Sequence, residues 1–307
     1  MSKKTTISWC DSTLNFWEGC TKVSPGCAQC YAEARDKRFT GGKLWGRGAL
    51  RRKSKSAVKD AVRLNSFPWI CDECGQEHAL LSQICLTPGC ECETNHRRRI
   101  FSLSLGDWLD DEVPIEWLAE MLDTIRQCDR VVWILCSKRI DKWRKRLEEV
   151  QNYDFDNGNR FLCGWIHDWL EWTVIPKNIC LLTSTENQAM VNNRILDLIK
   201  IPASWRGLSL EPLLESIDLN PDVYRLLDWL IIGGESGPHA RPCNVDWIRS
   251  LVDQGAKLGV ATFVKQLGTK PLNYSSPIPL LPQKDKKGGD FDKFPDELKV
   301  RQYPIGL

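Results

Sequence analysis

The sequence predicts an α/β protein whose main domain is a partial or complete βα barrel of the TIM type, with a small cysteine-rich insertion. Three observations predict this fold. Short apolar runs alternate with longer amphipathic stretches beyond residue 100, seven such runs are found in all, and polar side chains follow nearly every run. The alternation indicates a mostly parallel sheet. Seven βα-type units fit a barrel better than a doubly wound sheet, which is the alternative.

Seven strands are predicted, and the last six of them are apolar on both faces, as buried parallel strands are. The seven span residues 13–17, 100–105, 131–136, 179–184, 206–210, 229–232 and 260–264. Helices are predicted over residues 114–127, 141–150, 187–200 and 245–258. The first of these begins with a proline, which suits a first helical turn. The last two have apolar residues spaced three and four apart, as an amphipathic helix requires.

Two segments interrupt the alternation and set the predicted boundaries. Residues 1–65 are expected to hold the first strand, a cysteine loop and a basic segment, and residues 66–99 a metal-binding insertion. Residues 100–270 complete the barrel, and residues 271–307 form a C-terminal extension. The extension is rich in proline, lysine and glycine, which is typical of irregular or partly disordered chain.

The composition limits the class of protein. The formal net charge is only +2, so the whole-chain charge indicates neither a nucleic acid nor a membrane as partner. No apolar stretch is long enough to span a membrane, and the start, MSKKTTISWC, lacks the apolar core of a signal peptide. We therefore expect a cytoplasmic protein with no membrane partner. Clustered cysteines in such a chain more often hold metal than form disulfides.

The ends of the predicted strands supply candidate site residues, because barrels carry their chemistry at the carboxyl ends of the strands. The candidates are Ser104 and Asp107, Ser137 and Lys138, Ser184 and Glu186, Ser209 and Glu211, Gly233, Gly234 and Glu235, and Lys265 and Gln266. Helix caps and turns also place polar residues after strands. That explanation fits poorly for Glu211 before a proline and for Glu235 after two glycines.

The first cysteine group, Cys20, Cys27 and Cys30, has the spacing CxxxxxxCxxC. Three thiolates suit a 4Fe-4S cluster that keeps one iron free for a further ligand. A zinc site or a fully ligated cluster would want a fourth ligand, which Cys10 could supply. A redox CxxC pair would leave Cys20 without a role. The group therefore predicts an iron-sulfur cluster.

The stretch ISWCDSTLNFWEGCTKVSPGCAQCYAE resembles the opening of a phage-associated family of three-cysteine-motif proteins, which are widely treated as radical-SAM-like. Three later stretches are similar to family blocks in the same order: RRRIFSLSLGDWLDDEVP, WRGLSLEPLLESIDL and LDWLIIGGESGPHARPCNVDWIRSLVDQGAKLGVATFVKQLG. The resemblance covers the chain apart from the insertion and much of the extension. The spacing of the cysteines departs from the usual CxxxCxxC of radical-SAM enzymes.

The resemblance implies a radical-SAM barrel in which S-adenosylmethionine binds the free iron and is cleaved to a 5′-deoxyadenosyl radical. It implies that five strand-end residues bind the cofactor. Ser104 and Asp107 would contact the methionine amino group, and Ser184 and Glu186 would contact the ribose hydroxyls. Gly234 would line the adenine or substrate side. It implies catalytic roles for Glu211, Glu235 and Lys265. It also implies an electron donor such as flavodoxin or ferredoxin.

The second cysteine group lies in WICDECGQEHALLSQICLTPGCECETNHRRR and predicts a zinc ribbon. Cys71 and Cys74 are the first pair of ligands. Cys85 and Cys90 are favoured as the second pair, with Cys92 as the rival ligand. So small an insertion could hardly fold without metal. A second iron-sulfur cluster is the alternative.

Basic residues are expected on both sides of the first cysteine group. Residues 41–63 contain eight lysines and arginines, and the insertion ends in Arg97, Arg98 and Arg99. A basic surface beside a radical site would suit DNA or RNA, because phosphate neutralisation supplies most non-specific affinity. The alternative is a solvated charged face.

The predicted function is therefore a radical enzyme that modifies or repairs a nucleobase in DNA or RNA. The alternative is a non-catalytic nucleic-acid-binding protein with two structural metal sites. Isolated cysteines such as Cys136 and Cys180 are expected to be small buried residues. Cys243 is expected to be a loop cysteine, although base repair could use it as a hydrogen donor.

Overall fold

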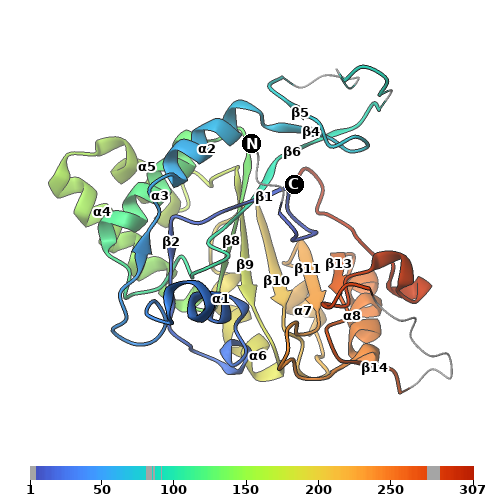
Figure 1. The fold of residues 1–307 in the computed structure, drawn as a ribbon. Coiled ribbons are helices and arrows are strands. Elements are labelled where there is room, and N and C mark those ends of the chain that lie inside the picture. The colour runs from blue at the N-terminus through green and yellow to red at the C-terminus, as the bar shows by residue number, and fades with distance from the viewer. Residues whose placement is uncertain (1–4, 81–84, 86, 91, 275–283) are drawn as a thin grey trace.

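The computed structural model describes residues 5–80, 85, 87–90, 92–274 and 284–307. Its centre is a parallel sheet of seven strands in the order β1-β7-β8-β9-β10-β11-β13 (Figure 1). These strands are β1 Ser12–Leu14, β7 Arg99–Ser102, β8 Val132–Ser137, β9 Ile179–Ser184, β10 Trp205–Leu210, β11 Trp229–Gly233 and β13 Ala261–Gln266. Each corresponds to a predicted strand, although β1 and β7 are shorter than predicted. The α/β class is therefore confirmed.

The sheet curls into a half-barrel in which β1 and β13 are the two edge strands. Neighbouring strands pair in parallel, for example Ile100 of β7 with Trp133 of β8. The arrangement is compatible with the predicted partial barrel. A complete barrel is not formed by the described residues, because β1 pairs only with β7 and β13 only with β11.

The described residues form eight α-helices, most of which pack on the outer face of the sheet. They are α1 Tyr31–Thr40, α2 Ala57–Ser66, α3 Ile115–Gln127, α4 Trp143–Asn157, α5 Arg160–Leu170, α6 Gln188–Leu198, α7 Pro221–Tyr224 and α8 Val245–Leu258. The four predicted helices correspond to α3, α4, α6 and α8. Helices α1, α2, α5 and α7 were not predicted, and α4 extends past the predicted end at residue 150. Within the described chain, no helix has the length and apolarity that crossing a membrane requires.

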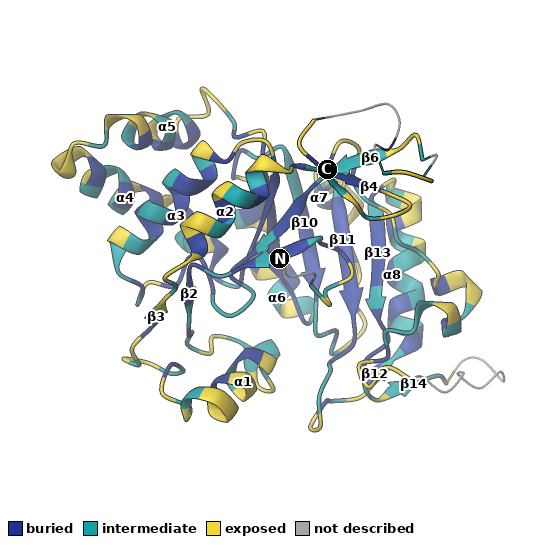
Figure 2. Cartoon of the chain, turned by 45° about the horizontal axis from the view of Figure 1, so that its top comes forward, coloured by how far each residue is buried: buried dark blue, intermediate teal, exposed yellow. Residues whose placement is uncertain are grey.

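The core has two layers because successive side chains of a strand point to opposite faces. In β8, Trp133 faces the outer layer beneath the helices, whereas Ile134 faces the inner layer. Trp9 and Leu307 also belong to the inner layer, so both ends of the chain help to fill the half-barrel. Figure 2 shows the strands of the sheet as almost continuously buried. Cys180 is fully buried, as predicted.

The described part of the C-terminal extension packs on the barrel. Two short 3-10 helices, η3 Phe291–Lys293 and η4 Asp296–Leu298, precede a bridge between Arg301 and Phe263 of β13. Leu298 is fully buried. Residues 284–307 therefore wrap irregularly around the fold. Irregular chain was one of the two structures predicted for the extension. Residues 275–283 lie outside the described residues.

The insertion forms a small antiparallel sheet of β4 Trp69–Cys71, β5 Glu77–His78 and β6 Asn95–Arg97. It lies at the amino edge of the large sheet, where the strands begin. Figure 1 shows it at the opposite end of the molecule from α1 and α6.

The three arginines that end the insertion are structural. Arg98 is 1% exposed, donates to Ser12 Oγ at 3.1 Å and pairs with Glu77 at 2.8 Å. Arg99 pairs with Asp11 at 3.2 Å, and Arg97 donates to main-chain oxygens before β8. The expectation that these arginines flank the first cysteine group is therefore wrong. Their side chains dock the insertion onto the ends of β1, β7 and β8.

Candidate functional site

A cavity of about 800 Å³ lies at the carboxyl edge of the sheet, where the strands end. The three cysteines of the first group line it. So do most of the predicted strand-end residues, namely Ser104, Asp107, Lys138, Ser184, Ser209, Glu211, Gly234, Glu235, Lys265 and Gln266. The cavity therefore unites residues that are far apart in the sequence.

The cysteine loop, residues 19–30, runs from β2 (Trp17–Glu18) to the start of α1. Gly19 has a φ of +113°, and a side chain there would come within 2.5 Å of Leu44 O. This glycine lets the chain turn just before Cys20. Pro25 then opens a 3-10 turn, η1, that ends at Cys27, and Cys30 is the N-cap of α1.

Glu186 lies beneath the cysteine loop and holds it in place. The Gly26 N–H donates to Glu186 Oε1 at 2.7 Å, and Arg194 pairs with Oε2 at 3.0 Å. A Cβ at position 26 would lie 2.9 Å from the Glu186 carboxyl carbon, so only glycine allows this approach. Burial alone would raise the pKa of Glu186, but hydrogen bonds from Ser24 and Gly26 and the charge of Arg194 lower it.

Glu186 is fully buried and does not belong to the cavity lining. The structure therefore places it beneath the loop, and not where it would meet the ribose as predicted. Its carboxylate is already engaged by the loop and by Arg194.

Glu235 makes a second connection to the loop through Arg241. Arg241 donates to both carboxylate oxygens of Glu235, at 2.6 and 2.9 Å, and its Nη1 donates to Pro25 O at 3.0 Å. Glu235 thus orients an arginine that holds the loop. The contacts of Glu235 do not support its predicted catalytic role, because both of its carboxylate oxygens accept hydrogen bonds from Arg241.

Asp107 is enclosed by donors. Its Oδ1 accepts from Leu109 N at 3.1 Å and from Ser137 Oγ at 2.6 Å. Its Oδ2 accepts from Lys138 N at 3.0 Å and from Arg139 Nη1 at 3.0 Å. These four bonds fill the usual acceptor positions of a carboxylate. Asp107 therefore organises the end of β8, although it was predicted to meet the methionine amino group.

Arg139 reaches the cysteine loop and was missing from the predicted site. Its Nη1 lies 3.5 Å from Cys20 Sγ, and its Nη2 donates to Thr21 O at 2.7 Å. The only sequence signal for it was its place directly after the polar pair that closes β8. The contact joins residues 119 positions apart, so spacing could not reveal it.

Glu211 and Lys265 form an ion pair of 2.8 Å on the cavity wall. A Cβ at Gly233 would come within 2.6 Å of Glu211 Oε1, so the glycine makes room for the carboxylate. Both side chains remain partly exposed, at 13% and 24%. They stay available to a bound molecule.

Ser104 and Ser184 lie on the cavity wall, where their hydroxyl groups could contact small polar groups of a ligand. Ser104 Oγ accepts from Asn15 Nδ2 at 3.2 Å, and its carbonyl oxygen accepts from the Tyr31 hydroxyl. Ser184 Oγ lies 3.3 Å from Cys136 Sγ. Cys136 lines the cavity, so the expectation that it is merely a buried core residue is wrong.

Gly234 has a packing role. A Cβ there would lie 2.4 Å from Leu267 O and 2.9 Å from the Cβ of Cys243. The glycine therefore allows close approach of the main chain after β13. Cys243 is 1% exposed, is absent from the cavity lining and lies in the two-residue strand β12 (Cys243–Asn244).

Charges in the cavity act on the thiols of the loop. Burial raises the pKa of Cys20 to about 12, and the Asp107 charge adds to this effect while Arg139 opposes it. Burial also raises the pKa of Cys30. Burial alone would lower the pKa of Lys138, but the charges of Cys27 and Cys136 raise it overall. Cys20 and Cys30 are thus poor thiolates unless a cation or a metal compensates their charge.

The chain matches the model of a family described as protein of unknown function DUF5131 over residues 4–295. It belongs to the DUF5131 family. No curated protein and no solved structure matches the chain. The family description gives no activity, so the site of this DUF5131 member must be understood from its own residues.

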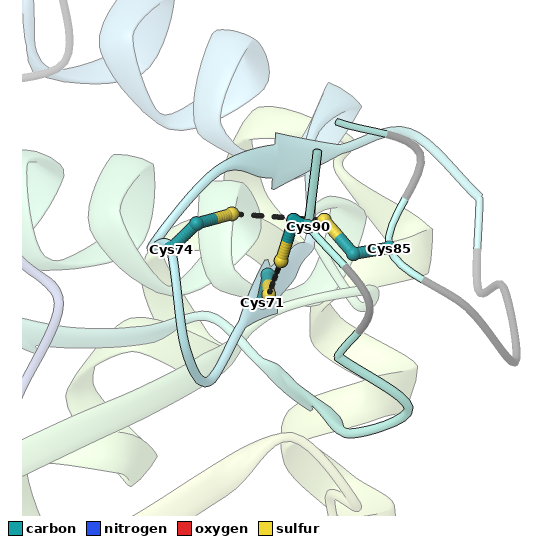
Figure 3. A group of neighbouring side chains, drawn as sticks. All are labelled: Cys71, Cys74, Cys85 and Cys90. Carbon is teal, nitrogen blue, oxygen red and sulfur yellow. Dashed lines mark hydrogen bonds between the residues drawn. The ribbon is translucent and has the colours of Figure 1, made fainter. Parts of the chain in front are cut away.

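The insertion of this DUF5131 member brings four cysteines together. The sulfurs of Cys71, Cys74, Cys85 and Cys90 all lie within 4.8 Å of one another (Figure 3). Cys71 faces Cys90 at 3.8 Å, and Cys74 faces Cys85 at 3.6 Å. This compact four-cysteine group could hold a metal ion, and it is the ligand set that the sequence favoured.

Two further residues of the insertion clarify the four-cysteine group. The Cys92 thiol faces Thr94 O at 3.3 Å and lies outside the group, so the rival ligand is not supported. The buried His78 has its Nε2 3.5 Å from Cys85 Sγ. A ring N–H at this position would donate to a thiolate ligand, which is the kind of outer contact that orients metal ligands.

The cysteine loop is more open. Across the described chain, Cys20, Cys27 and Cys30 do not form a group within the 4.8 Å that unites the four-cysteine group. A cluster of several irons is larger than one ion and holds its sulfurs further apart. Cys10, considered as a fourth ligand, packs in the inner core with its thiol toward Ile7 O. The donor set fits a three-thiolate cluster better than a single ion.

Proposed function

We propose that this protein is a radical S-adenosylmethionine enzyme that binds a 4Fe-4S cluster through Cys20, Cys27 and Cys30. One observation carries the proposal. Three cysteines of one loop line a cavity of about 800 Å³ at the carboxyl edge of a curled parallel sheet, where barrels carry their chemistry. Cys10, the fourth ligand of the alternative site, lies in the core, which supports one iron being left for an outside ligand.

When bound, the reduced cluster would give one electron to S-adenosylmethionine and so release methionine and a 5′-deoxyadenosyl radical. The protein's own residues would hold and enclose these groups. Glu186 and Arg241 fix the loop, as their contacts with Gly26 and Pro25 indicate. Ser104 and Ser184 offer hydroxyl groups on the cavity wall.

The Glu211–Lys265 pair is the best candidate for contact with a substrate. Its members are partly exposed, lie 2.8 Å apart and present one acceptor and one donor side by side. A substrate amide or base edge carries the complementary donor and acceptor. We therefore keep catalytic or substrate-binding roles for Glu211 and Lys265, and assign Glu235 to positioning the loop.

We propose zinc for the four-cysteine group. Four thiolates in a compact arrangement are typical of structural zinc, and all four positions are taken by protein ligands. The insertion would then serve folding and not catalysis. An iron-sulfur cluster is the competing occupant.

A nucleobase in DNA or RNA is the proposed substrate. Lys43, Arg47, Lys55 and Lys59 are exposed on the segment that contains Trp45, which lines the cavity. Arg51 cannot contribute, because it is buried and pairs with Asp110 at 2.9 Å. The four exposed cations could neutralise phosphates of a bound nucleic acid.

The first experiment is metal analysis and electron paramagnetic resonance of protein prepared without oxygen. We expect about four irons per chain and about one zinc. We also expect a dithionite-reduced signal that changes when S-adenosylmethionine is added. Zinc in place of iron at the cysteine loop would overturn the enzyme proposal and favour a non-catalytic protein with two structural metal sites.

The substrate is tested separately. Reduced protein is incubated with S-adenosylmethionine and with DNA, RNA or free nucleosides, and 5′-deoxyadenosine is measured. We expect one nucleic acid class to raise its formation above the substrate-free background. Equal formation in all samples would refute the nucleic-acid assignment and leave the cofactor assignment intact.

A further inference from the structure

Two cations that follow β8 adjoin the cysteine loop. Arg139 is 4% exposed, and its guanidinium touches Cys20 Sγ at 3.5 Å, Thr21 O at 2.7 Å and Asp107 at 3.0 Å. Lys138 precedes it and lines the same cavity as Cys27. Both cations come from the end of β8 and not from the loop itself, and Arg139 is also held by Asp107, which lies outside the loop.

Both glutamates that line the cavity are paired with cations. Glu211 pairs with Lys265 at 2.8 Å, and Glu235 pairs with Arg241 at 2.6 Å. The Lys138 ammonium makes no such pair with a carboxylate among the described residues. The wall therefore keeps a positive charge close to the sulfurs of the loop.

A positive charge there has a direct consequence for a bound iron-sulfur cluster. Three thiolates give the site a negative charge, and reduction adds one more electron without forming or breaking a bond. In a partly buried cavity this added charge is costly unless cations or hydrogen-bond donors lie nearby. Hydrogen bonds to the cluster sulfurs and local charge are known to set the reduction potential.

We propose that Arg139 and Lys138 raise the reduction potential of the cluster, Arg139 through its contact with Cys20 and Lys138 through its charge in the cavity. This inference rests on the proposed iron-sulfur function. Arg139 is then a positioning residue, because it acts through a cluster ligand. Its bond to Thr21 O keeps it in place whether or not the cluster is reduced.

The test is a redox titration of oxygen-free protein, with dithionite as the electron source and the signal of the reduced cluster as the readout. The variants are Arg139→Gln, Arg139→Lys and Lys138→Met, and the control is Lys142→Met. Lys142 lies only a few residues away but pairs with Asp111 and does not line the cavity of the cysteine loop. Iron content is measured for each protein before the titration.

We expect Arg139→Gln to lower the ratio of reduced to oxidised cluster at a fixed potential by at least about tenfold, or about 59 mV for one electron. Arg139→Lys restores most of the loss because it keeps the charge. Lys138→Met lowers the ratio several-fold, and Lys142→Met leaves it unchanged.

The outcomes separate the inference from the proposed function. Full iron content with unchanged potentials in Arg139→Gln and Lys138→Met overturns the inference alone. A wild-type protein without iron at the cysteine loop overturns both. If Arg139→Gln does not fold, Lys138→Met decides the question, because the side chain of Lys138 lacks the buried ion pair that Arg139 makes with Asp107.

Discussion

The two cysteine groups of this molecule lie at opposite edges of one sheet and differ in what surrounds them. The four-cysteine group is closed, with its four sulfurs within 4.8 Å of one another. The cysteine loop opens into a cavity of about 800 Å³ with charged walls. A closed set of ligands suits a structural ion, whereas an open set leaves a position for chemistry.

The groups also differ in what holds them. The loop is fixed by protein contacts, since Glu186 meets Gly26 and Arg241 meets Pro25. The insertion is a sheet of three very short strands, and its four cysteines form its centre. We infer that metal should be essential to the shape of the insertion and dispensable for the shape of the loop. This contrast can be tested in four ways.

The largest expected effect is that of Cys27→Ser. The variant should lose the iron of the loop almost completely and with it all formation of 5′-deoxyadenosine, because a cluster held by two thiolates is not retained. Zinc content should stay the same, since the four-cysteine group lies at the other edge of the sheet. Cys163→Ser, which changes a half-buried cysteine of α5, is the matched control. Iron at the wild-type level in Cys27→Ser would contradict the ligand assignment.

The reverse effect is expected for Cys74→Ser. The variant should lose zinc and unfold the insertion, because the small sheet has little apolar core without its metal. Iron content should remain, and limited proteolysis should cut within residues 66–99 and spare the barrel. A protein that loses both metals together would show that the two regions are coupled and would break the comparison.

Substitution of Glu186, which holds the cysteine loop, is expected to have a smaller effect. Glu186→Gln should lower the free energy of unfolding by about 3 kcal/mol, because it leaves the buried Arg194 without its carboxylate partner. Glu215→Gln, in which an exposed carboxylate accepts from Gln188 N, should change it by less than about 1 kcal/mol. Urea unfolding of the metal-free proteins measures both. Equal values would mean that the loop does not depend on Glu186.

Sequence patterns could predict the strands because each is a short apolar run whose two faces are both buried. Helix α8 was predicted to the residue, since its apolar residues recur every three or four positions. Helix α1 was missed because only Ala32 and Asp36 are buried in it. Its sequence carries no apolar stripe that a pattern could detect.

Sequence patterns could predict which residues line the site but not what each of them does there. Strand ends gather at one edge in any parallel sheet, so Ser104, Glu211 and Lys265 were found from position alone. Which carboxylate faces a ligand and which faces an arginine depends on side chains distant in sequence. Asp107 is engaged by Arg139, and this contact has no signature in spacing or composition.

The smallest effect is expected for Cys92→Ser, and it tests how the closed group chooses its ligands. Cys92 is only two residues from Cys90, yet its sulfur lies 3.3 Å from Thr94 O and outside the group of four mutually close thiols. The substitution should therefore leave zinc content and Tm unchanged, whereas Cys90→Ser should remove the zinc. Metal analysis of Cys92→Ser and Cys90→Ser, prepared in parallel, shows which of the two cysteines is a zinc ligand. Loss of zinc from Cys92→Ser would mean that the metal draws Cys92 into the group, and that the closed arrangement forms only around the ion.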